Sequence, residues 1–216
     1  MDARFRVLPV FFLVTVVASS LLIDAAWAQV PSRDGFVPVT DAILQEPDPD
    51  DWINWRRTLD GWGYSPLTQI NTDNVHELQL VWAWQLDTGV SRPTPLVYDG
   101  LMFIPSPGNS VHALDAATGR SYWRSQQLDS AVRGSPALDN DTAFIATDGG
   151  SLYALDAING NQIWGFQVDA SNADRLLADP IARDGLVYIT AMNGERLVMA
   201  YHQDSGQMAW QFQPDG

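Results

Sequence analysis

The sequence predicts an all-β fold built from repeated four-stranded antiparallel sheets, that is, a partial β-propeller. The main observation is one phrase, Ala-x-x-x-x-x-Gly-x-x-x-Trp, which occurs from Ala113 to Trp123, from Ala154 to Trp164 and from Ala200 to Trp210. Trp82, in VWAWQLDTG, lies one further interval upstream. Intervals of roughly 40 residues are the size of a propeller blade. An ordinary antiparallel sandwich with tryptophans spaced by chance is the alternative.

Each phrase follows two short apolar runs that are separated by a turn. The turn residues are Asp99-Gly100, Asp139-Asn140-Asp141 and Asp184-Gly185. Asp-Gly between alternating apolar runs indicates a hairpin, since both central residues of its favoured turn need positive φ. The Thr-Gly, Asn-Gly or Ser-Gly inside each phrase gives a second tight turn before a strand with Trp. We therefore expect about four blades, with each Trp packed between neighbouring sheets.

The first residues have the pattern of an export signal. Arg4 and Arg6 precede an apolar run over residues 7–23, and Ala26-Trp27-Ala28 then provides a small-x-small cleavage site. These features predict a signal peptide over residues 1–28. An uncleaved membrane anchor is the alternative, although the apolar run is short for a spanning helix. We expect no membrane span in the rest of the chain.

Composition excludes several classes of site. The 216 residues carry a net charge of −14 and contain no cysteine. The charge disfavours binding to nucleic acid or to anionic lipid, and the lack of cysteine removes thiolate metal sites and dithiol chemistry. Residues 29–50 are rich in Pro and Asp and are expected to form an irregular arm. A calcium loop in the run EPDPDD is the alternative, but this run lacks the glycine and distal glutamate of such a loop.

The stretch from Asp51 to Gly89 resembles the amino-terminal region of the pyrroloquinoline quinone (PQQ)-dependent alcohol dehydrogenases, quinoproteins of the bacterial periplasm. The residues that carry the resemblance are Trp52, Tyr64-Ser65-Pro66-Leu67, Gln69-Ile70-Asn71, Asn74-Val75, Leu78 and Trp82. The resemblance implies an eight-bladed propeller, of which residues 51–216 would be a part. It also implies a quinone beside a calcium ion, alcohol oxidation assisted by an aspartate, and electron transfer to a cytochrome.

Two site residues follow from the resemblance. Arg133, in AVRGSPAL, matches the arginine of the family that contacts the quinone, and a fixed guanidinium suits quinone and carboxylate oxygens. Glu195, in NGER, stands where the family has a calcium ligand, and a carboxylate is a suitable hard ligand for calcium. The alternatives are a surface arginine that closes a strand and an ordinary turn glutamate.

The sequence departs from the family at several positions that face the cofactor. A cysteine pair, a glutamate, a threonine and a serine of the family fall here at Gln127 and Leu128, Arg92, Leu177 and Met192. The glycine-rich loop after Glu195 is shortened, and the family's catalytic aspartate aligns with no residue of this chain. The chain is thus expected to hold no catalytic residue and to be inactive alone.

Two functions therefore remain open. The chain is part of a PQQ- and calcium-dependent alcohol dehydrogenase, partnered by a complementary propeller half or a cytochrome, or it is a non-catalytic propeller scaffold. His76, His112 and His202 are scattered without the spacing of metal ligands, so we expect each to be structural.

Overall fold

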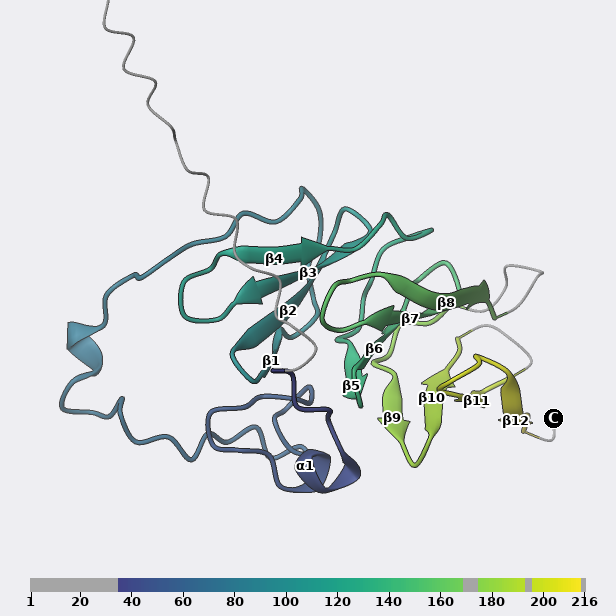
Figure 1. The fold of residues 1–216 in the computed structure, drawn as a ribbon, viewed down its shortest axis with the longest axis horizontal. Coiled ribbons are helices and arrows are strands. Elements are labelled where there is room, and N and C mark those ends of the chain that lie inside the picture. The colour runs from purple at the N-terminus through teal and green to yellow at the C-terminus, as the bar shows by residue number, and fades with distance from the viewer. Residues whose placement is uncertain (1–34, 169–174, 193–195, 215–216) are drawn as a thin grey trace, which may run out of the picture.

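The computed structural model describes residues 35–168, 175–192 and 196–214, and these residues form three four-stranded antiparallel sheets (Figure 1). In each sheet the strands are ordered as they follow one another in the chain. The first sheet contains β1 (Leu96–Tyr98), β2 (Leu101–Ser106), β3 (Ser110–Asp115) and β4 (Ser121–Arg124). The second contains β5 (Ala137–Asp139), β6 (Thr142–Ala146), β7 (Ser151–Asp156) and β8 (Gln162–Gln167). The third contains β9 (Ile181–Arg183), β10 (Leu186–Thr190), β11 (Val198–His202) and β12 (Met208–Phe212).

The three sheets lie side by side as blades, with β1, β5 and β9 toward one side of the molecule and β4, β8 and β12 away from it (Figure 1). This arrangement confirms the expected all-β, partial-propeller fold. About four blades were expected, and the described residues contain three complete ones. Around Trp82, residues 79–87 run across the first sheet without forming a strand of any sheet.

The predicted hairpin turns connect the first two strands of each sheet. At the turn between β1 and β2, Asp99 and Gly100 have φ values of 48° and 75°. Both are in the left-handed region, as this type of hairpin requires. The turn between β5 and β6 differs, because Asn140 is there the only residue of positive φ.

The repeated phrase has a structural reason at each of its three positions. In the second sheet, Ala154 of β7 lies opposite Trp164 of β8 and is fully buried, so there is no room for a larger side chain beside the indole. A β-bulge follows directly, between Ala154 and Leu155. Gly160 has a φ of 74°, and a Cβ placed there would lie 2.5 Å from the ring of Trp123 in the preceding sheet. Glycine is therefore needed both for the turn and for the close approach of this tryptophan.

Two tryptophans of the repeated phrase, Trp123 and Trp164, are followed in the chain by another sheet. Each of them forms a hydrogen bond to that next sheet. Trp123 Nε1 donates to the main-chain oxygen of Ala157 at 3.1 Å, and Trp164 Nε1 donates to that of Gln203 at 2.8 Å. The acceptor stands three residues before the phrase glycine in both cases. The expected packing of tryptophan between sheets is thus confirmed, and it includes a specific polar contact.

The core consists of one apolar cluster between the first and second sheets and another between the second and third. The described part of the arm covers the first cluster and contains helix α1 (Asp41–Gln45), whose Leu44 is buried. Thr40 caps this helix by accepting a hydrogen bond from the Ile43 amide. One 3-10 turn, η1 (Val75–Glu77), lies in the long connection to β1.

The signal-peptide prediction falls on residues 1–28, outside the described residues. No helix within the described ranges is both long and apolar enough to span a bilayer.

Candidate functional site

Arg133 lies at the entry of β5, where the isolated bridge between Val132 and Thr147 fixes the chain. Its Nε is 2.9 Å from Asp148 Oδ2, and its Nη1 donates to the main-chain oxygen of Val90 at 3.4 Å. The Asp148 side chain is only 14% exposed, whereas that of Arg133 is 32% exposed. The guanidinium is therefore held in one orientation by a largely buried carboxylate, with part of it open to solvent.

A second arginine shares the same carboxylate. Arg175 Nη2 lies 3.7 Å from Asp148 Oδ2, and Arg175 itself is fixed by a main-chain bridge to Met192. The two guanidinium groups thus carry two positive charges against one negative charge at Asp148. The sequence analysis named Arg133 but neither of these partners, because Asp148 and Arg175 are brought to it only by the pairing of strands.

The position predicted as a calcium ligand, Glu195, lies outside the described residues. Among the residues that the structure describes, no group of three or more His, Asp or Glu side chains is placed to hold a metal ion. Next to the undescribed segment, Met192 is 54% exposed. Its thioether offers no strong hydrogen bond where the family has a serine.

Of the remaining positions that depart from the family by the resemblance, Leu128 and Leu177 are apolar, whereas Arg92 and Gln127 are polar and exposed. Leu128 is buried in the core between the first two sheets, and its main-chain N–H donates to the Asn109 oxygen at 2.7 Å. Leu177 is half-buried and lies just before β9. For a bound quinone, the described residues therefore supply the fixed guanidinium of Arg133, but Leu128, Leu177 and Met192 give no strong side-chain donor. The donor set fits PQQ only in part.

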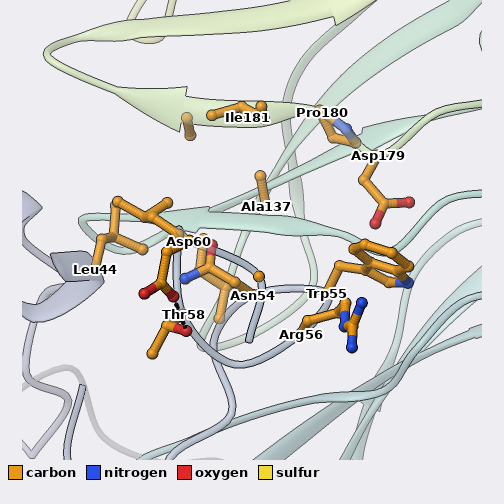
Figure 2. A pocket seen from close by; sticks show the side chains of 14 residues that line it. Leu44, Asn54, Trp55, Arg56, Thr58, Asp60, Ala137, Asp179, Pro180 and Ile181 are labelled. Carbon is orange, nitrogen blue, oxygen red and sulfur yellow. Dashed lines mark hydrogen bonds between the residues drawn. The ribbon is translucent and has the colours of Figure 1, made fainter. Parts of the chain in front are cut away.

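A cleft of about 280 Å³ lies between the loop of residues 54–61 and strands β5 and β9 (Figure 2). Trp55, Arg56 and Asp179 stand at one end, where the Arg56 guanidinium lies 5.5 Å from the centre of the Trp55 ring (Figure 2). Burial raises the pKa of Asp179, although its Oδ1 accepts a hydrogen bond from the Ser135 N–H at 2.7 Å. This cleft offers two carboxylates, Asp60 and Asp179, and one aromatic face among mostly apolar walls. No signal in the sequence distinguished Asp179 from the other aspartates.

A hydrogen-bond network around one carboxylate joins the first and second sheets. Asp129 accepts hydrogen bonds from the hydroxyl groups of Thr147, Ser151 and Tyr153, at 3.0, 2.9 and 3.2 Å. Asp87, in the segment after Trp82, accepts from the hydroxyl of Ser106 at 2.9 Å in a similar way. An aspartate follows Trp82, Trp123 and Trp164 in WQLD, QQLD and FQVD. This second repeat was a signal that sequence reasoning missed.

The chain is similar to known proteins over this same region. Residues 52–166 match the family described as the glucose/ethanol/alcohol dehydrogenase β-propeller domain, named PQQ. The chain is 39% identical over 128 residues to the dehydrogenase subunit of the quinone alcohol dehydrogenase of Acetobacter aceti, covering 57% of this chain and 17% of that protein.

Solved structures agree with this match. A quinohemoprotein alcohol dehydrogenase of Pseudomonas putida superposes with a TM-score of 0.72 at 30% identity, over 86% of this chain and 29% of that one. A europium-containing methanol dehydrogenase superposes with a TM-score of 0.70 at 27% identity, over 81% of this chain and 34% of that one. The chain thus spans only a minor part of the length of these relatives. It belongs to the PQQ family of alcohol dehydrogenase β-propeller domains and covers part of that propeller.

Proposed function

We propose that this chain is part of the propeller of a PQQ-dependent alcohol dehydrogenase, exported to the periplasm and inactive without the rest of that propeller. The observation that carries the proposal is the family match over residues 52–166, which contains the first sheet, all but the last residue of the second, and Arg133. The relatives are named alcohol dehydrogenases. In this proposal the complete protein oxidises an alcohol and passes electrons to a cytochrome.

Arg133 is the residue that would hold the cofactor. When bound, PQQ supplies the acceptor of a hydride from the alcohol. Arg133 is oriented by Asp148 and has an exposed part of its guanidinium left to donate to an oxygen of the quinone or a carboxylate. Because this orientation is fixed before binding, little side-chain entropy is lost on contact. Glu195 would contribute one carboxylate oxygen to a calcium ion.

A non-catalytic scaffold is the second candidate, and one observation favours it. Leu128, Leu177 and Met192 stand where the family has polar groups that face the cofactor, whereas the contacts between the sheets are retained. A propeller that keeps its packing but loses its cofactor contacts would serve as a binding surface. The two candidates differ in whether PQQ binds.

Calorimetric titration of the purified chain with PQQ in the presence of calcium distinguishes them. We expect weak binding that Arg133→Ala abolishes, because the remaining described positions supply few donors. Arg124→Ala is the matched control, since Arg124 also pairs with an aspartate, Asp87 at 3.3 Å, but on the first sheet. Equal binding by the Arg133→Ala variant would remove this residue from the site. No binding by the wild-type chain would favour the scaffold.

Dye-linked alcohol oxidation tests the second half of the proposal. The chain with added PQQ and calcium is expected to give no turnover, since the resemblance places the catalytic aspartate outside it. Turnover by the purified chain would refute the proposed inactivity.

A further inference from the structure

The residues before the prolines at the entries of the inner strands link neighbouring sheets. These residues are Thr94, Ser135 and Asp179, which stand two positions before β1, β5 and β9. The Thr94 N–H donates to Ser135 Oγ at 2.9 Å, and the Ser135 N–H donates to Asp179 Oδ1 at 2.7 Å. Ser135 and Asp179 thus each accept a hydrogen bond from the main chain of the preceding sheet. At Asp179 the acceptor is a carboxylate, which in its ionised form accepts a stronger hydrogen bond than a hydroxyl group does.

Gly134 brings the second sheet and the segment before β9 into direct contact. A Cβ at Gly134 would lie 2.7 Å from Asp179 Oδ1 and 2.9 Å from the main-chain oxygen of Ala178. Any side chain at this position would therefore push the two segments apart. Ser135, the next residue, is only 2% exposed, so water has little access to its N–H, and Asp179 is the acceptor that satisfies it.

Arg133 stands between two anchors of the main chain. Before it, the Ala131 oxygen accepts a hydrogen bond from the Asp148 N–H at 2.8 Å. After it, the Ser135 N–H is held by Asp179. The first anchor belongs to the second sheet itself, whereas the second comes from the third sheet. A change at either anchor turns the main chain at Arg133 and so moves its Nε away from Asp148 Oδ2, which lies 2.9 Å from it.

We propose that Asp179 is a positioning residue for Arg133, which keeps the guanidinium on Asp148 by fixing the main chain that follows Arg133. The exposed part of the guanidinium then remains available to an oxygen of PQQ. The inference rests on the proposed function where it concerns PQQ. The positioning of Arg133 is a property of the chain without cofactor and can be measured separately.

Asp139 provides the matched control, because it joins the same two sheets through a hydrogen bond at the other end of β5. Its Oδ2 accepts from Gln203 Nε2 at 2.6 Å, and Asp139 is only 4% exposed. If Asp179 did no more than link the second and third sheets, removal of either carboxylate would affect Arg133 to a similar extent. Under the proposal, only the loss of Asp179 does so.

The test follows the Arg133 Nε–H by nuclear magnetic resonance in the purified chain without PQQ, with its signal assigned by its absence from Arg133→Ala. We expect Asp179→Ala to speed exchange of this proton with water at least about tenfold, because the bond to Asp148 opens more often. Asp179→Asn keeps an acceptor oxygen and should stay within about twofold of the unsubstituted chain, as should Asp139→Ala. Unchanged exchange in a folded Asp179→Ala variant would overturn the proposal, and so would an equal effect of Asp139→Ala.

Two further measurements decide the matter where Asp179→Ala does not fold. In the unsubstituted chain, the Ser135 N–H should exchange at least about a hundredfold more slowly than an unprotected amide. Fast exchange at Ser135 would remove the anchor on which the inference depends. Gly134→Ala keeps the carboxylate but separates it from Ser135, and it should speed exchange at the Arg133 Nε–H as Asp179→Ala does. Unchanged exchange in a folded Gly134→Ala variant would contradict the proposal.

Calorimetric titration with PQQ and calcium connects the positioning to the cofactor. We expect Asp179→Ala to weaken PQQ binding at least about fivefold, because a smaller fraction of the chain holds Arg133 in the competent orientation. Asp139→Ala should bind PQQ as the unsubstituted chain does. Equal PQQ affinity in an Asp179→Ala variant whose Arg133 exchange has increased would refute the link to the cofactor. Absence of PQQ binding by the unsubstituted chain would refute the proposed cofactor role, whereas the exchange measurements would still decide the positioning of Arg133.

Discussion

The link between neighbouring sheets can be measured by replacing Trp123 with phenylalanine. Trp123 is only 7% exposed, and its indole N–H bonds to the main-chain oxygen of Ala157, a fully buried residue. Phenylalanine keeps one ring but removes the donor, and an unpaired buried carbonyl costs about 1–3 kcal/mol. The lost ring volume adds about 1 kcal/mol, since the site can collapse only in part. We therefore expect Trp123→Phe to lower the free energy of unfolding by about 2–4 kcal/mol.

Trp210 provides the matched control for this experiment. It has the same place in the third phrase, but its side chain is 44% exposed and has no hydrogen-bond acceptor among the described residues. Trp210→Phe should therefore change stability by no more than about 0.5 kcal/mol. Urea unfolding followed by far-UV circular dichroism measures both variants without depending on tryptophan emission. A similar loss in both, or a loss below about 1 kcal/mol for Trp123→Phe, would refute the argument that these sheets are joined through the indole N–H.

Two further predictions concern the turns and the acidic groups. Gly160→Ala should lower the free energy of unfolding in urea by at least about 1 kcal/mol more than Gly100→Ala does. Both glycines have positive φ, but only at Gly160 would the added methyl group meet a neighbouring ring, that of Trp123. Equal effects of the two substitutions would mean that turn strain alone matters. Burial raises the pKa of Asp51, Asp139 and Asp179. These groups therefore take up protons more readily in the folded chain, and stability should rise as pH falls from neutral through their raised pKa values. A hydrogen bond from Thr118 lowers the pKa of Asp115 below the ordinary value of 3.8, so the stability that Asp115 contributes is lost only at lower pH. A free energy of unfolding that falls steadily as pH decreases from neutral would contradict the stabilisation expected from Asp51, Asp139 and Asp179.

Much of the fold could be predicted because its determinants are local. The positions of Asp99-Gly100 and of the phrase glycines mark turns whose residues are adjacent in the sequence, and each hairpin pairs neighbouring strands. The spacing of the tryptophans then indicates that the hairpins stack as equivalent units. The expected fourth unit does not form a sheet around Trp82, and strand pairing between remote segments is the kind of contact that a local pattern does not encode.

The site was predictable only where one residue carried the signal. Arg133 was predicted through a motif and its role stays a prediction, but its orientation depends on Asp148, which the bridge between Val132 and Thr147 brings into range. Arg175 reaches the same carboxylate from the segment before β9, where an isolated bridge joins it to Met192. Such contacts depend on how whole sheets are placed, and no local pattern in the sequence encodes them.

In the proposed function, packing and cofactor binding use different strands, so that one could be lost while the other is kept. The tryptophans that join the sheets lie on β4 and β8, the outermost strands, whereas Arg133 and Leu177 lie at the entries of the innermost strands β5 and β9. Leu177, which by the resemblance stands in place of a threonine, could therefore remove a proposed cofactor contact without disturbing the inter-sheet hydrogen bonds of Trp123 and Trp164. For this reason the repeats and the family match show the fold and family of this chain, whereas PQQ binding has to be measured directly, at Arg133.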